Sequence, residues 1–92
     1  MNLDGKYIKL DSNNVESVIK FIYKNGYNWI YEDKTKIDVV LKTAIHNINV
    51  RNYTYIMFNC NSFYFQWMVE KNFEFFDINK YLREYKLKRI LK

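Results

Sequence analysis

The sequence predicts an α+β fold in which an antiparallel sheet of four or five strands carries two or three helices, packed mainly on one face. Three stretches support this prediction. Residues 53–69 contain seven aromatic side chains and no charge, and they alternate as strands do. Residues 15–23 and residues 37–48 instead repeat apolar side chains at helical spacing. Because 92 residues can fill only one hydrophobic core, we expect a single domain over residues 1–92.

The chain begins with a predicted strand and helix. Residues 6–10 alternate in a way that predicts a strand with Tyr7 and Lys9 on one face. A helix should follow, because Asn13 and Glu16 have the spacing of a capping box. Its apolar stripe consists of Val15, Val18, Ile19, Ile22 and Tyr23.

Gly26 supplies the left-handed residue that ends such a helix, and residues 27–31 predict a second strand. The next helix is predicted over residues 37–48. Its apolar positions are Ile37, Val40, Leu41, Ala44, Ile45 and Ile48. The pair Val39-Val40 also suits a strand of a hairpin that turns at Asp33-Lys34, so a second interpretation of this stretch stays open.

The central strand is the most aromatic element. Alternation places Ile56 and Phe58 on one of its faces, and Tyr53, Tyr55 and Met57 on the other. Both faces are too apolar to be left in water. Either a second layer covers the outer face, or that face binds a partner.

The aromatic stretch should continue through a hairpin. Residues 59–62, Asn-Cys-Asn-Ser, predict the turn, and residues 63–69 alternate as a return strand through Phe63, Phe65, Trp67 and Val69. The rival interpretation is a helix capped by Ser62 and ended by Asn72. Residues 73–76 then predict a short last strand. Asp77 should cap a final helix that turns Ile78, Tyr81, Leu82 and Tyr85 inward.

No motif for catalysis, a cofactor or a metal ion is present. His46 and Cys60 are the only residues of their types, whereas a nucleophile needs a base and an orienting group, and a zinc site needs four ligands. The two glycines are far apart, so no glycine-rich loop can hold a nucleotide phosphate. We therefore expect a protein that is not an enzyme.

Charge and cysteine content narrow the compartment and the partners. One cysteine cannot form an internal disulfide, and no apolar run reaches the roughly 18 residues of a membrane span, so we expect a soluble cytoplasmic protein without a membrane partner. The net charge of +5 is concentrated in residues 77–92, which hold six basic and two acidic side chains. This segment is either a solvated helix face or a phosphate-binding patch.

The surplus of tyrosine and tryptophan favours a protein-interaction surface, because these residue types dominate the energetics of interfaces. The candidate partner-binding residues are Tyr53, Tyr55, Tyr64 and Trp67. Two other readings of the same residues stay open: the helices cover this face, or a homo-oligomer buries it.

Residues 51–58, Arg-Asn-Tyr-Thr-Tyr-Ile-Met-Phe, are similar to the RNP1 octamer of RNA-recognition motifs. The resemblance implies that Tyr53 and Tyr55 stack on bases while the even positions enter the core. Asn52 and Thr54 depart from the small residues expected there. The alternative function is thus binding of RNA or single-stranded DNA, with the basic C-terminus as a phosphate clamp. Its candidate residues are Arg51, Tyr53, Tyr55, Lys80, Arg83, Lys86, Lys88 and Arg89.

Over most of its length the chain resembles small proteins encoded by bacteriophages with low-GC genomes. The resemblance rests on residues 6–10, a short capped helix, residues 25–29, residues 55–58 and the helix that Asp77 begins. It implies a non-catalytic binder that inhibits or modulates a host protein, ribonucleoprotein or defence complex in the host cytoplasm, as anti-CRISPR proteins do. It transfers no site residues. The basic charge disfavours mimicry of DNA, which needs an acidic surface.

Overall fold

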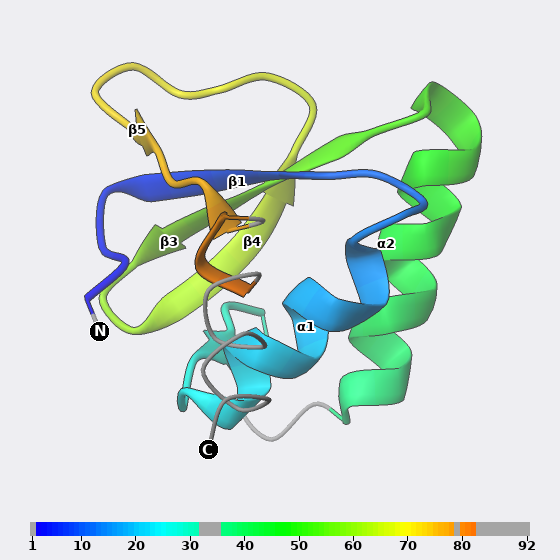
Figure 1. Ribbon diagram of the computed structural model, residues 1–92, viewed down its shortest axis with the longest axis horizontal. Coiled ribbons are helices and arrows are strands. Elements are labelled where there is room, and N and C mark those ends of the chain that lie inside the picture. Colours follow the sequence, from blue (N-terminus) through cyan, green and yellow to red (C-terminus); the bar gives the residue numbers. More distant parts are fainter. Residues whose placement is uncertain (1, 32–35, 79, 83–92) are drawn as a thin grey trace.

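In the part of the chain that the structure describes, five strands form one mixed sheet in the order β2-β4-β3-β1-β5, and the helices α1 and α2 pack against it (Figure 1). The computed structural model describes residues 2–31, 36–78 and 80–82. Its elements are β1 (Lys6–Leu10), α1 (Val15–Lys24), β2 (Asn28–Trp29), α2 (Ile37–Arg51), β3 (Thr54–Asn59), β4 (Ser62–Gln66) and β5 (Glu74–Phe75). The predicted α+β class and the strand number are confirmed.

The prediction of a purely antiparallel sheet is wrong at both edges. β3 pairs antiparallel with β1 and with β4, but β2 runs parallel to β4 and β5 runs parallel to β1. At the second edge, the Glu74 N–H donates to the Gly5 carbonyl at 2.9 Å and the Phe76 N–H donates to the Tyr7 carbonyl at 3.0 Å. Alternation within a segment carries no information on direction, because either orientation keeps the same side chains on the same face.

The central hairpin forms as predicted. Cys60 and Asn61 both have positive φ, 52° and 63°, which is the geometry of a two-residue turn whose twist matches the flanking strands. β4 ends at Gln66, so the predicted strand is too long, and the rival helix over residues 63–71 is wrong. Ring-bearing residues at alternate positions gain more from the pleated surface than from a helix.

α1 buries the predicted stripe, and Gly26 follows it with a φ of 81°. The predicted capping box between Asn13 and Glu16 is absent from this described segment, because Asp11 serves the turn instead. The Asp11 Oδ1 atom accepts from the N–H groups of Asn13 and Asn14, at 2.8 and 3.1 Å, and the Asn14 side-chain amide donates to the Lys9 carbonyl. This turn links the end of β1 to the start of α1.

α2 confirms the helical interpretation of residues 37–48, and the alternative strand at Val39-Val40 is wrong. The helix continues to Arg51, three residues farther than predicted, and Asn52 ends it in the left-handed conformation with a φ of 71°. The turn predicted at Asp33-Lys34 lies outside the described residues.

Tyr27 explains why the second strand is only two residues long. Its ring enters the core and packs edge-on against Phe58, with 5.1 Å between centroids, and its phenol oxygen accepts the Leu3 N–H at 2.7 Å. The Tyr27 N–H donates to the Ile22 carbonyl of α1 at 3.2 Å, and pairing with β4 covers only Asn28 and Trp29.

We predict that Tyr27→Phe lowers the free energy of unfolding by about 1–3 kcal/mol, because it removes the acceptor of a buried backbone N–H. Urea denaturation followed by circular dichroism measures the change. Tyr31→Phe is the matched control, since Tyr31 is exposed and should lose little. Equal stability of the two variants would contradict the role given to the Tyr27 hydroxyl.

The last described segment leaves the sheet and returns to the helices. Asp77 Oδ1 accepts the Lys80 N–H at 3.1 Å, as predicted for a helix cap, and Ile78 is buried. Tyr81 packs against Phe21 of α1 with 5.3 Å between ring centroids. Tyr85, the other predicted inward residue, lies outside the described residues.

The hydrophobic core lies between the sheet and the helices α1 and α2, which cover the same face (Figure 1). The strand residues on that face are Ile8, Leu10, Ile56, Phe58 and Phe63, all buried. Register then places the intervening strand residues on the opposite face.

Candidate functional site

The face of the sheet opposite α1 and α2 is rich in aromatic side chains, and we name it the open face. In one line across the strands, Met57 lies between Tyr7 and Tyr64. In the neighbouring line, Tyr55 lies between Lys9 and Gln66. The open face comprises Tyr7, Lys9, Tyr53, Tyr55, Met57, Tyr64, Gln66 and Phe75. It is assembled from β1, β3, β4 and β5, so no single stretch of sequence contains it.

Four rings form a continuous row across three strands of this face. Tyr53 and Tyr55 lie 5.4 Å apart between centroids, Tyr55 and Tyr7 lie 5.7 Å apart, and Tyr7 and Phe75 lie 5.7 Å apart. The three tyrosines are half-buried, and Phe75 is 58% exposed. The rings thus support one another by edge contacts and still present surface to a partner.

Met57 is the one buried side chain among the residues of the open face. It is fully buried although it points away from the main core, since its cross-strand neighbours are Tyr7 and Tyr64. Met57 lies between these two rings in the sheet register. The open face is therefore a pre-formed surface, which lowers the entropy lost when a partner orders it.

Two cations accompany the rings at one end of the sheet. The Lys9 Nζ atom lies 5.0 Å from the Tyr53 centroid, and the Arg51 guanidinium lies 4.5 Å from the Trp67 centroid. Both basic residues are exposed. Within the described part of the chain, neither makes an ion pair with a carboxylate, so their charge is not neutralised there.

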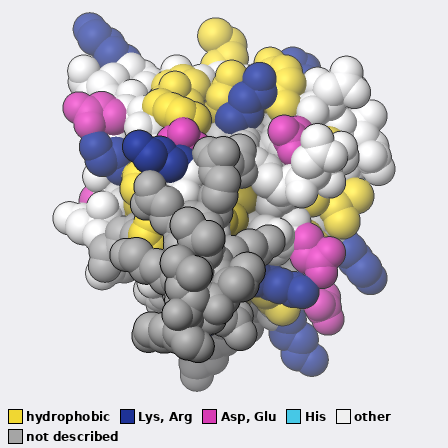
Figure 2. Space-filling model, in the orientation of Figure 1, with side chains coloured by type: hydrophobic (Ala, Val, Ile, Leu, Met, Phe, Trp, Pro, Cys, Tyr) yellow, Lys and Arg dark blue, Asp and Glu magenta, His cyan; other side chains and the backbone are white. Residues whose placement is uncertain are grey.

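An acidic side chain also meets the open face, at Tyr64 of β4. The Tyr64 hydroxyl donates to Glu70 Oε1 at 2.9 Å, and burial together with this bond raises the pKa of Tyr64 to about 12. Glu70 belongs to the segment between β4 and β5, which passes on this side of the sheet (Figure 1). Figure 2 shows hydrophobic side chains interspersed with both basic and acidic ones in the upper part of the same view.

The structure brings three of the four predicted partner-binding residues onto one face. Tyr53 and Tyr55 are in contact, and Tyr64 occupies a position diagonal to Tyr55 on the neighbouring strand. Trp67 lies just beyond the end of β4, against Arg51. Its place is thus at the margin of the open face, beside the cation that ends α2.

The residues predicted for nucleic-acid binding separate into two groups. Arg51, Tyr53 and Tyr55 lie together at the start of β3. Lys80 belongs to the segment that packs against α1, on the other side of the sheet, so it does not join them. Arg83, Lys86, Lys88 and Arg89 lie outside the described residues.

Sequence reasoning missed that β1 and β5 contribute to this surface. The alternation of residues 6–10 puts Tyr7 and Lys9 on one face, but only the pairing of β1 with β3 places them beside Tyr55. Phe75 joins through the parallel pairing of β5 with β1. The usable signal was that each of the three strand segments carries an aromatic residue on one face, Tyr7, Tyr55 and Phe75.

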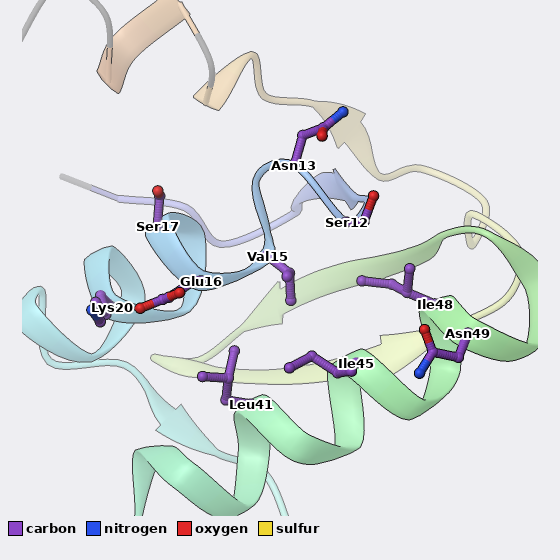
Figure 3. Close-up of a pocket in the computed structure, with 10 residues that line it drawn as sticks. All are labelled: Ser12, Asn13, Val15, Glu16, Ser17, Lys20, Leu41, Ile45, Ile48 and Asn49. Carbon is purple, nitrogen blue, oxygen red and sulfur yellow. Dashed lines mark hydrogen bonds and ion pairs between the residues drawn. The ribbon is translucent and has the colours of Figure 1, made fainter.

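A shallow groove between the start of α1 and α2 has a volume of about 470 Å³ (Figure 3). Its apolar residues are Val15, Leu41, Ile45 and Ile48, and its other lining residues are Ser12, Asn13, Glu16, Ser17, Lys20 and Asn49. Lys20 pairs with Glu16 at 2.8 Å and lowers the pKa of that carboxyl. The groove offers polar groups that are already exposed or paired, and no reactive group stands out among its lining residues.

The other residues with reactive or metal-binding side chains lie on separate elements of the structure. His46 is exposed on α2, and Cys60 is exposed in the hairpin turn. Among the described residues, no three His, Cys, Asp or Glu side chains gather as a metal site. The helices in this part of the chain are all too short or too polar to cross a bilayer.

Comparison of the chain with protein-family models, with curated proteins and with solved structures gave no match.

Proposed function

We propose that this chain is a non-catalytic binding protein whose open face contacts a protein or ribonucleoprotein complex of a host cell. The observation that carries the proposal is the row formed by Tyr53, Tyr55, Tyr7 and Phe75, whose rings are held in place yet remain partly exposed. Large rings with few rotatable bonds give much contact area for little lost entropy, which is why they dominate interfaces.

The surroundings of the row support this use. Figure 1 shows both helices on the other side of the sheet, and no described helix lies over the row. Phe75 is 58% exposed at the edge that β5 forms, and Met68, just after β4, is 78% exposed. Apolar side chains gathered in this way gain free energy when a partner removes them from water.

The resemblance to small phage proteins supports a partner in an infected cell. Under this proposal the chain acts in the host cytoplasm and inhibits or modulates a host enzyme or a defence complex by occupying it, in the manner of anti-CRISPR proteins. Binding alone suffices for such a role, so no reactive group, metal ion or cofactor is required.

The test is affinity capture from a host lysate with the full chain, compared with Tyr55→Ala and with Val50→Ala. Tyr55 lies in the middle of the row, while Val50 is exposed on α2, on the other side of the sheet. We expect Tyr55→Ala to weaken capture about thirtyfold, since a central aromatic contact contributes about 2 kcal/mol or more. Val50→Ala should capture as the unchanged chain does.

Circular dichroism and a thermal melt of each variant confirm that the fold is retained. Nuclease treatment of the lysate separates protein partners, which remain bound, from partners held only through nucleic acid. Unchanged capture by Tyr55→Ala and by a second variant, Tyr7→Ala, would overturn the proposal, because the open face would then take no part in binding.

A further inference from the structure

We infer that the open face accepts a single-stranded nucleic acid, with bases on the rings of Tyr53, Tyr55 and Tyr7 and with phosphates at Lys9 and Arg51. The inference rests on the proposed function, because it names the partner, or the component of a ribonucleoprotein partner, that this same face takes. Single-stranded RNA and single-stranded DNA share the required chemistry, and the experiment below separates them.

The spacing of the rings in the row suits successive bases of one strand. Successive centroids in the row lie 5.4, 5.7 and 5.7 Å apart, from β3 across β1 to β5. Every base has a flat π-face, so a row of partly exposed rings can take successive bases of one strand. The bases of a duplex are stacked on one another and cannot reach such a row, which favours single strands.

The positive charges of Lys9 and Arg51, at one end of the row, complement the phosphates of a nucleic acid. Lys9 lies opposite Tyr55 in the sheet and over the ring of Tyr53, and Arg51 lies over Trp67 at the end of α2. Neither is paired with a carboxylate in the described part of the chain, so each can meet a phosphate. A neutral or cationic protein surface would leave these two charges without a partner.

The acidic side chain of Glu70 meets the open face at a ring outside the row. Glu70 approaches the open face only at β4, where Tyr64 donates to it. The row itself lies on β3, β1 and β5, and Lys9 lies over its Tyr53 end, so a strand bound along the row meets Lys9 there and does not include the Tyr64–Glu70 pair of β4. Phosphates are therefore expected at the Tyr53 end of the row, where Lys9 and Arg51 lie, rather than at Tyr64.

The measurement is fluorescence anisotropy with the full chain and labelled 12-nucleotide probes of oligo-U RNA, oligo-dT DNA and a DNA duplex, at two salt concentrations. We expect single strands to bind at low salt at least tenfold tighter than the duplex. Tyr7→Leu should weaken binding about tenfold or more, as expected for the loss of a stacking ring, while Tyr7→Phe keeps the ring and the affinity. Tighter binding of oligo-U than of oligo-dT would identify RNA as the partner, and the reverse would identify DNA; either supports the inference.

Lys9→Gln tests the phosphate contact, with Lys42→Gln on the exposed side of α2 as its matched control. We expect Lys9→Gln to reduce the slope of log affinity against log salt by about 0.7, and Lys42→Gln to leave it unchanged. Circular dichroism of each variant verifies folding.

Three results would overturn the inference: no binding of either single strand at low salt, equal affinity for the duplex, or binding that Tyr7→Leu and Lys9→Gln leave unchanged. In the last case the binding would come from elsewhere in the chain. If Tyr55→Ala still abolishes nuclease-resistant capture from lysate, the proposed function stands and the partner is a protein alone. If that capture is also unaffected, both proposals fail.

Discussion

Val40→Asp is expected to unfold the domain, whereas the same substitution at the neighbouring Val39 leaves it folded. Val40 is 1% exposed in the core between α2 and the sheet, and Val39 is 55% exposed on the outer side of the helix. A carboxyl group at position 40 would lose its water without gaining a partner, in addition to the lost apolar packing. We expect a loss of about 4 kcal/mol or more, out of a total stability of about 5–14 kcal/mol for a domain of this size.

The matched pair is informative because the two positions differ only in the direction of the side chain. Urea denaturation followed by circular dichroism should give a cooperative transition for Val39→Asp near that of the unchanged chain, and little or no folded baseline for Val40→Asp. Similar transitions for both variants would show that residues 37–51 do not pack as α2 is described.

Phe58→Ala is expected to lower the free energy of unfolding by about 3–5 kcal/mol. Phe58 is fully buried in β3, where it faces Phe63 across the hairpin and packs against Tyr27, with centroid distances of 6.5 and 5.1 Å. Truncation would leave a cavity bounded by these two rings, and neither can close it without leaving its own contacts.

Phe75→Ala is the control for Phe58→Ala, since the same side chain is 58% exposed at the sheet edge. We expect it to cost about 1 kcal/mol or less. The midpoints of urea denaturation compare the two losses directly. A Phe58→Ala variant as stable as Phe75→Ala would place Phe58 outside the core and reverse the two faces of β3.

Local patterns predicted the elements whose identity depends on short-range physics. The stripe from Val15 to Ile22 produced α1, the repeat from Ile37 to Ile48 produced α2, and two adjacent turn residues, Cys60 and Asn61, produced the hairpin. In each case the spacing of apolar residues or the backbone preference of a turn residue fixes the structure without distant contacts.

The parts that were mispredicted depend on distant partners. Both parallel pairings join segments far apart in sequence, Lys6 with Glu74 and Asn28 with Ser62, and no local pattern records such a choice. The prediction of a capping box was wrong for a related reason. Asn13 had the right spacing to Glu16, but Asp11 was better placed to hold the turn after β1.

The candidate site was predicted in part. Alternation in β3 placed Tyr53 and Tyr55 on the face away from the core, and the structure has them there. The contribution of Tyr7, Lys9 and Phe75 could not be predicted, because it follows from strand order and direction. The same limit explains why Lys80 was grouped with residues from which the sheet separates it.

The attachment of β5 has a consequence for how the domain is completed. Two backbone hydrogen bonds, from the Glu74 N–H to the Gly5 carbonyl and from the Phe76 N–H to the Tyr7 carbonyl, join segments that are nearly 70 positions apart along the chain. Closing a loop of this length costs more chain entropy than forming the two-residue turn between β3 and β4. Since Phe75 also supplies the last ring of the row, that ring is in place only when the most distant pairing of the sheet has formed.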